Sequence, residues 1–139
     1  MSTVADVMTE NPACFPASAS VTDAAQVMRD RHIGDVLVVD DDRLIGIVTD
    51  RDIVVRGVAS DDGTDAMRLE ELATATPVHV SMSDDSDMVV TMMRERGIRR
   101  VPVCDGDGRP IGVVSLGDLA MDKDPGSALA EISHEPPNN

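Results

Sequence analysis

The sequence contains 139 residues, and 12 basic against 26 acidic side chains give it a net charge of −14 at neutral pH. This length suits one compact unit of ordinary domain size, and the excess of acidic groups, which repel phosphate backbones and anionic lipids, excludes nucleic-acid and membrane-surface binding. No apolar run approaches the roughly 20 residues of a membrane span, no secretory signal is visible, and two cysteines are too few for a disulfide scaffold, so we expect a cytoplasmic protein.

The first half of the chain predicts a series of short elements. Pro12 ends a helical turn and favours an extended chain before it. Ser20 or Thr22 can cap the helix that follows, in which apolar residues recur with the i, i+3, i+4 spacing of an amphipathic helix. Two β-branched runs flank an acidic turn, which is typical of an antiparallel hairpin. The predicted elements are a helical turn (4–8), a strand (13–15), a helix (23–31), a hairpin (36–40 with 44–48) and a short helix that begins near Asp50.

The second half repeats this pattern. VMRDRHIGDVLVVDDD (27–42) aligns with MMRERGIRRVPVCDGD (92–107) at an offset of 65 residues, and Gly108 is a one-residue insertion in the second copy. Register that is kept along both copies indicates an internal repeat. The second copy predicts a helical turn (69–73), a strand (78–80), a helix (86–96), a hairpin (101–104 with 111–114) and a helix that begins near Leu116.

The repeat also predicts the domain organisation. A copy of about 55 residues is marginal for independent folding, so the two copies are expected to bury their sheets against each other with pseudo-twofold symmetry. Such symmetry creates two equivalent crevices. The C-terminal tail is expected to be flexible, with at most a short helix around 128–132. The predicted segments are a first copy (1–58), a polar linker (59–68), a second copy (69–123) and the tail (124–139).

Each copy closes with the pattern G-h-x-[ST]-x-x-D, as GIVTDRD at 46–52 and GVVSLGD at 112–118. A tandem β-α-β-β-α unit with this motif in register resembles a cystathionine-β-synthase (CBS) domain pair, an α+β fold, and is similar to the small hypoxic response proteins of actinobacteria. The resemblance covers residues 3–122. It implies a non-enzymatic regulatory module for energy or stress sensing, with no required cofactor. Its crevices would bind AMP, ADP, ATP or a related adenosyl ligand.

The motif has a physical logic of its own. Gly46 has no side chain, so another backbone or a flat ring can approach it closely. Thr49 and Asp52 open a helix whose unpaired N–H groups favour a phosphate, and Arg51 can add positive charge. The Thr49 hydroxyl can donate to a phosphate or ribose oxygen, and the Asp52 carboxylate can accept from both ribose hydroxyls. The alternative is a capping box, in which the hydroxyl accepts a helix N–H and the acid reaches back. The two interpretations compete for the carboxylate.

The resemblance extends the predicted site beyond the motif. It implies that the adenine ring lies against the strand that contains Cys14 and against the backbone at Gly34, Asp35 and Val36. The corresponding residues of the second copy are Gly112, Ser115, Asp118, His79, Arg99 and Arg100.

Charge distinguishes the two predicted crevices. Asp35 and Asp50 oppose an anionic ligand in the first crevice. The second crevice lacks a counterpart of Arg51, although Arg99 and Arg100 compensate. We expect the two crevices to bind unequally, with the first better formed and selective for AMP or ADP over ATP.

Methionine-rich helices are a candidate partner surface. Their methionines can fill a core, yet the run 88–93 spreads apolar residues around more than one helix face, and methionine suits adaptable interfaces. The resemblance implies that two pairs stack through these helices into a homodimer that acts on an unidentified protein target. The methionines concerned are Met28, Met88, Met92 and Met93.

Neither catalysis nor metal binding is predicted. The three histidines share no metal-ligand spacing with the cysteines. Neither cysteine has a paired base, so Cys14 and Cys104 are expected to be small buried apolar residues. The alternative to a nucleotide sensor is a stress-response interaction protein with degenerate or empty ligand sites.

Overall fold

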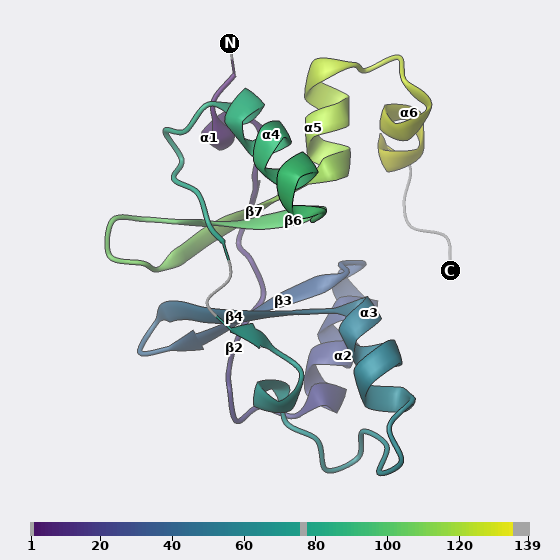
Figure 1. Cartoon of the computed structure of the whole chain (residues 1–139). Coiled ribbons are helices and arrows are strands. Elements are labelled where there is room, and N and C mark those ends of the chain that lie inside the picture. Colours follow the sequence, from purple (N-terminus) through teal and green to yellow (C-terminus); the bar gives the residue numbers. More distant parts are fainter. Residues whose placement is uncertain (1, 76–77, 135–139) are drawn as a thin grey trace. The chain divides into compact units, whose positions relative to one another are not determined.

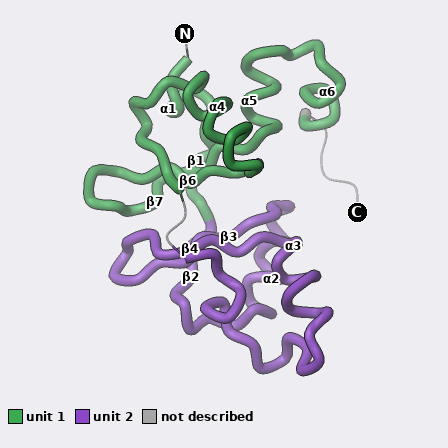
Figure 2. The backbone as a smooth tube through the Cα atoms, viewed as in Figure 1, with its two compact units in different colours: residues 1–12, 78–139 green, residues 13–77 purple. Residues whose placement is uncertain are grey.

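The structure of the chain, a computed structural model, describes residues 2–75 and 78–134 (Figure 1). The chain divides into two compact units (Figure 2). We call residues 13–77 the middle unit, and residues 1–12 together with 78–139 the split unit. Each unit is defined by itself, so the crevices expected between the two copies stay a prediction.

The middle unit contains a four-stranded sheet in the order β2-β3-β4-β5. β2 is parallel to β3, and the other neighbouring strands are antiparallel. Asp41 and Asp42 adopt left-handed conformations at the tip of the β3–β4 hairpin, as a two-residue hairpin turn requires. The elements are β2 (Cys14–Pro16), α2 (Val21–Arg31), β3 (Asp35–Asp40), β4 (Arg43–Thr49), α3 (Asp50–Asp52), the π-helical segment η1 (Ile53–Val58), the short 3-10 helix η2 (Leu69–Glu71) and β5 (Thr74–Ala75).

The split unit contains a three-stranded antiparallel sheet in the order β1-β7-β6. The strand predicted at 78–80 is wrong, because this segment forms only a parallel bridge from Val80 to Val103. The elements are α1 (Val4–Val7), β1 (Thr9–Glu10), α4 (Ser86–Arg96), β6 (Arg100–Cys104), β7 (Pro110–Ser115), α5 (Leu116–Lys123) and α6 (Ala128–His134).

Each sequence copy opens with a short helix and a two-residue strand, α1 with β1 and η2 with β5, which we call its lead-in. Each lead-in lies in the unit that contains the rest of the other copy. Val4 is fully buried in the core of the split unit, and its N–H donates to the Asp84 carbonyl over 2.8 Å. Leu69 is fully buried in the core of the middle unit, and its N–H donates to the Ala19 carbonyl over 2.9 Å. The strands that follow them, β1 and β5, pair with β7 and β4. Each unit therefore contains the lead-in of the other sequence copy.

Polar caps determine where the two long helices begin. The Asp23 N–H donates to Ser20 Oγ over 3.0 Å, which identifies Ser20 rather than Thr22 as the cap of α2. α4 coincides with the predicted helix 86–96, and the Asp85 side chain caps it. The predicted start of α4 is thus confirmed, whereas α2 begins at Val21, two residues before the predicted helix 23–31, because Ser20 is its cap.

The methionines divide between core and surface. Met28 and Met93 are 7% and 4% exposed and lie in the cores of the middle and split units. Met88 is 42% exposed, and Met92 is half-buried. The homodimer expected through these helices stays a prediction.

The C-terminal tail contains a helix that is longer than the predicted 128–132. α6 packs on α5 in the split unit, and Ala130 is only 2% exposed. The described part of the tail is therefore a packed element. Residues 135–139, which were also expected to be flexible, lie outside the described residues.

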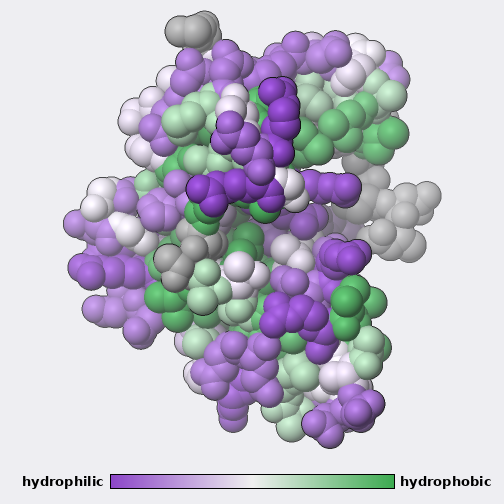
Figure 3. Space-filling view, in the orientation of Figure 1, coloured by the Kyte–Doolittle hydropathy of each residue, from purple (hydrophilic) through white to green (hydrophobic). Residues whose placement is uncertain are grey.

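Hydrophobic residues gather over α5 and α6 and over η1 on the face shown in Figure 3. Exposed apolar residues of these elements include Met121, Leu129 and Ile132 in the first group and Val54, Val55 and Val58 in the second. Within the described ranges, no helix has the length and apolar character needed to traverse a bilayer.

Candidate functional site

The first motif lies where β4 meets α3 in the middle unit. The Thr49 N–H donates to Asp52 Oδ2 over 2.8 Å, and the Asp52 N–H donates to Thr49 Oγ1 over 3.2 Å. These reciprocal bonds are a capping box. Both residues are half-buried. The capping box uses Oδ2 of the Asp52 carboxylate, so the carboxylate can cap the helix and still accept a hydrogen bond from a ligand at Oδ1.

The beginning of β3 lies beside this helix start. Asp35 is the sheet partner of Thr49, and the Asp50 N–H donates to the Gly34 carbonyl over 2.9 Å. Val36, the next residue of β3, is fully buried in the core of the middle unit. We call the group formed by Gly34, Asp35, Thr49, Arg51 and Asp52 the first corner.

Cys14 lies outside this group. It is on β2, where its partner is Leu37 of β3. Its side chain is exposed, so the expectation of a buried Cys14 is wrong, whereas the buried Cys104 is confirmed. The physical reason is that β2 is a three-residue edge strand with exposed first and last residues.

The motif glycines make room for backbone. A Cβ atom on Gly46 would lie 3.1 Å from Ala73 Cβ and 3.2 Å from the Thr74 carbonyl oxygen. On Gly112 it would lie 2.9 Å from the Thr9 carbonyl oxygen. The sequence predicted that either a backbone or a flat ring approaches such a glycine. The structure contains a backbone neighbour in both cases, β5 at Gly46 and β1 at Gly112.

The second corner repeats the geometry in the split unit. The Ser115 N–H donates to Asp118 Oδ2 over 3.0 Å, and the Asp118 N–H donates to Ser115 Oγ over 3.1 Å. Arg100 is the sheet partner of Ser115, and the Leu116 N–H donates to the Arg99 carbonyl over 2.9 Å. We call the group formed by Arg99, Arg100, Ser115 and Asp118 the second corner.

The two corners differ in charge. The first contains Asp35 and Asp52 against Arg51, whereas the second contains two arginines against Asp118. An anionic group is therefore favoured more at the second corner on charge alone. His79 lies on the exposed segment that precedes the Val80 bridge to β6.

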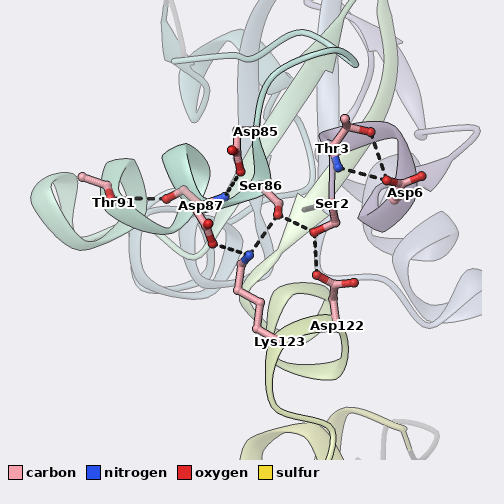
Figure 4. A network of polar contacts seen from close by, with 9 residues as sticks. All are labelled: Ser2, Thr3, Asp6, Asp85, Ser86, Asp87, Thr91, Asp122 and Lys123. Carbon is pink, nitrogen blue, oxygen red and sulfur yellow. Dashed lines mark hydrogen bonds and ion pairs between the residues drawn. The ribbon is translucent and has the colours of Figure 1, made fainter.

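A polar network in the split unit was not anticipated from the sequence (Figure 4). Lys123 Nζ donates to Ser86 Oγ over 2.9 Å and forms an ion pair with Asp87. Ser86 Oγ lies 2.6 Å from Ser2 Oγ, which donates to Asp122 Oδ2 over 2.7 Å. These hydrogen bonds connect α4, α5 and the N-terminal segment. Because Ser86 is fully buried, its hydroxyl is not accessible to a substrate as a nucleophile.

A sequence signal for this network exists in the repeat. At the aligned positions of the middle unit, Ser2, Ser86 and Lys123 are replaced by Met67, Val21 and Gly57. Three polar residues stand where the middle unit has none, and Lys123 is the only lysine of the chain. Coincident polar replacements at one set of repeat positions indicate a buried hydrogen-bonded group.

The two thiols are expected to differ in reactivity. Cys14 is exposed as a residue, yet neighbouring atoms still cover part of its thiol; this partial burial raises the pKa of the Cys14 thiol above its ordinary value of 9.0, while Arg31 opposes the shift and Asp42 adds to it. Because the thiolate is the reactive form, alkylation of Cys14 should be slow at neutral pH and should keep accelerating beyond pH 9.0. Cys104, which is 3% exposed, should react only after unfolding.

Thiol titration in buffer and in urea measures both rates, and Cys14→Ser is the control that should abolish the reaction of the folded protein. A rate that levels off below pH 9.0, or a reactive Cys104 in the folded protein, contradicts the prediction.

Metal ligands were not expected from the sequence. Among residues 2–75 and 78–134, no group of three or more His, Cys, Asp or Glu side chains is arranged to hold a metal ion. The absence of a metal in the protein stays a prediction.

The two repeats of the chain, each with its motif at a strand-to-helix corner, match a known family. The family model of the CBS domain matches residues 4–58 and 69–122. The chain belongs to the CBS domain family. The expected tandem CBS domain pair and its α+β fold are thereby confirmed.

Relatives of this CBS domain pair include hypoxic response proteins, as the sequence led us to expect. It is 36% identical over 121 residues to Hypoxic response protein 1 of Mycobacterium tuberculosis, covering 86% of this chain and 84% of the relative. It is 35% identical over 139 residues to the uncharacterized protein YlbB of Bacillus subtilis, covering 96% and 93%.

Solved structures resemble the CBS domain pair over most of its length. Hypoxic Response Protein I with two coordinated zinc ions has a TM-score of 0.77 and 35% identity, covering 86% of this chain and 98% of that chain. CBSX2 in complex with AMP has a TM-score of 0.76 and 28% identity, covering 88% and 96%.

Proposed function

We propose that this CBS domain pair is a regulatory module that binds an adenine nucleotide at the first corner. One observation carries the proposal: Thr49 and Asp52, both half-buried, stand together at a helix start with one hydroxyl proton and one carboxylate oxygen outside the capping box. The AMP complex of the structurally similar CBSX2 supports this class of ligand.

The Thr49 hydroxyl can serve the helix and a ligand at once. A hydroxyl has one donor and two acceptor lone pairs. Thr49 Oγ1 uses an acceptor site for the Asp52 N–H. Its O–H remains able to donate to a phosphate or ribose oxygen of the nucleotide.

The two oxygens of the Asp52 carboxylate can likewise serve the helix and a ligand separately. Oδ2 accepts the Thr49 N–H over 2.8 Å. Within the described part of the chain, the hydrogen bond to this carboxylate is accepted by Oδ2, so Oδ1 is available to a ligand. A vicinal ribose diol can donate to it, and a bond to a charged acceptor is about twice as strong as a neutral one.

The charges of the first corner favour a nucleotide with few phosphates. Arg51 is exposed on the first helical turn and can contact one phosphate. Asp35 and Asp50 flank the same turn and repel additional anionic groups. These charges support a preference for AMP or ADP over ATP.

Binding regulates a partner only if the nucleotide has different affinities for two arrangements of the chain. The proposed output is therefore a conformational bias that is passed to a protein target. No step of the proposal requires turnover of the nucleotide.

Isothermal titration with AMP, ADP and ATP tests the proposal, with Asp52→Asn as the main variant. The amide oxygen of the introduced asparagine would still accept the Thr49 N–H, so the cap should persist while the charge is lost. We expect AMP to bind about tenfold or more weakly to this variant, because a hydrogen bond to a charged group contributes about 1.5–3 kcal/mol.

Asp118→Asn makes the same change at the second corner and is the matched control, for which we expect wild-type AMP affinity. Equal AMP affinity of the wild type and Asp52→Asn would falsify the assignment. Absence of binding by all three nucleotides would favour an interaction protein with empty sites.

A further inference from the structure

The chain enters its two lead-ins through matching backbone hydrogen bonds. In the split unit, the Ser86 N–H donates to the Ser2 carbonyl over 3.1 Å. At the aligned positions of the middle unit, the Val21 N–H donates to the Met67 carbonyl over 3.0 Å. The same correspondence holds for the N–H donors Val4 and Leu69 and for the N–H donors Ala5 and Glu70. The backbone hydrogen bonds therefore do not distinguish one lead-in from the other.

Side chains at the same positions are polar in the split unit (Figure 4). Ser2 Oγ donates to Asp122 Oδ2 over 2.7 Å, and this bond uses its only proton. The hydroxyl of the buried Ser86 therefore donates to Ser2 Oγ over 2.6 Å, while Ser86 Oγ accepts from Lys123 Nζ. We call Ser86, Asp122 and Lys123 the polar socket. It favours a hydrogen-bonding side chain two residues before the lead-in, because buried hydroxyls need partners.

The middle unit is apolar in the same place. Met67 is half-buried and packs against the core of this unit, in which Val21 is 1% exposed. A Cβ atom on Gly57, the counterpart of Lys123, would lie 3.8 Å from Met67 Sδ. Gly57 thus lets the thioether lie close to the backbone of η1. We call Val21 and Gly57 the apolar socket, and neither of them has a polar side chain to pair with a serine.

We propose that the two sockets direct each lead-in to its unit: the polar socket takes the segment that follows Ser2, and the apolar socket takes the segment that follows Met67. In the interchanged arrangement, the Ser86 hydroxyl would face a thioether, which is a weak acceptor, and the Ser2 hydroxyl would face Val21. Both contacts give polar groups poor partners, which costs free energy. The sockets thus select one of two arrangements that the backbone permits.

This selection matters because a duplicated chain can dock the wrong one of two equivalent segments. Each lead-in ends in a strand that lies against a motif glycine, β1 at Gly112 and β5 at Gly46. These glycines stand three residues before Ser115 and Thr49. The sockets therefore also decide which lead-in strand lies next to each motif. This selection does not depend on nucleotide binding.

Ser2→Met and Ser86→Val, alone and together, separate stability from selection in the full chain. Each single substitution mismatches the polar socket: the first removes the acceptor of the Ser86 hydroxyl, and the second places Ser2 beside an apolar side chain. The double variant reproduces the Met67–Val21 pair of the middle unit. Ser83→Met introduces the same side chain as Ser2→Met at an exposed serine of the split unit and is the matched control.

Amide hydrogen exchange measures how stably the first lead-in is docked. Protection of the Val4 and Ala5 amides should fall by about tenfold or more in each single variant, because a hydroxyl loses its hydrogen-bond partner. In the double variant it should return to within about threefold of the wild-type value, since two apolar groups replace the paired hydroxyls. Ser83→Met should exchange like the wild type. Losses that multiply in the double variant, or wild-type protection in both single variants, would overturn the proposed pairing.

Refolding from urea measures selection itself. A lead-in that docks on the wrong unit must leave it before the native state forms, so misdocking adds a slow phase. We expect the double variant to refold with a slow phase that the wild type lacks, because a methionine then precedes both lead-ins and a valine faces each of them. Far-ultraviolet circular dichroism follows refolding, and added prolyl isomerase accelerates the phases of proline isomerisation. Wild-type refolding kinetics in the double variant would contradict the proposed selection.

Discussion

Replacement of Leu69 by alanine is expected to lower the free energy of unfolding by about 2–5 kcal/mol. Leu69 is fully buried among the apolar residues of the middle unit, together with Leu72 and Val48. Truncation removes apolar contacts and leaves a cavity that the surrounding β-sheet can fill only in part. Urea unfolding measures the loss.

The location of the effect tests the exchange of lead-in segments. Leu69 belongs to the second copy by sequence, but its contacts are in the middle unit. Amides of β3 and β4 should therefore lose more hydrogen-exchange protection than amides of β6 and β7. Glu70→Ala changes an exposed residue of the same turn and should cost little. The reverse pattern of exchange would refute the exchange of segments.

Gly112→Val is expected to destabilise the protein by about 1–3 kcal/mol through overpacking. The new Cβ would lie 2.9 Å from both Met8 Sδ and the Thr9 carbonyl oxygen. The methionine can move aside, but the carbonyl belongs to β1, which pairs Glu10 with Gly112. The substitution should therefore displace β1 from β7, and urea unfolding together with exchange of the β1 amides measures this.

Gly106→Ala is the control for this substitution. A Cβ atom at Gly106 meets no atom within 4 Å, so the free energy of unfolding should stay close to that of the wild type. Wild-type stability of Gly112→Val would mean that β1 does not lie against Gly112.

Local elements were well predicted where the cause is local. Ser20 was one of two predicted cap residues before an amphipathic run, and α2 forms there and begins directly after it. The acidic turn between two β-branched runs became the tip of the β3–β4 hairpin. In both cases neighbouring residues supply the interactions that select the conformation, so the sequence suffices.

Short strands and exposure were less predictable. β1 and β5 are two residues long, and their pairing depends on glycines in strands far away along the chain. Cys14 resembles a core residue by type, yet it is on an exposed edge strand. Residue type does not reveal which strand becomes the edge of a sheet.

The heptapeptides led to two predictions for the same residues, a helix cap and a ligand site, of which the structure tests the cap. Thr49 with Asp52 was expected either to cap a helix or to hold a ligand, and the structure contains the cap. Because the cap uses only Oδ2 of Asp52, a helix cap and a ligand site are compatible at this carboxylate. The spacing of the residues in the sequence could not show this.

The amino-acid sequence by itself determined the duplication, the family, the start of α4 and the two hydroxyl–carboxylate pairs, because each depends on residues close together in the chain or on comparison of the two copies. Only the tertiary structure decided which core receives each lead-in, since Val4 and Leu69 occupy equivalent positions of the repeat and a sequence alignment is the same for either partner. That choice depends on burial and hydrogen bonds between segments distant in the chain, which exist only once the sheets have formed.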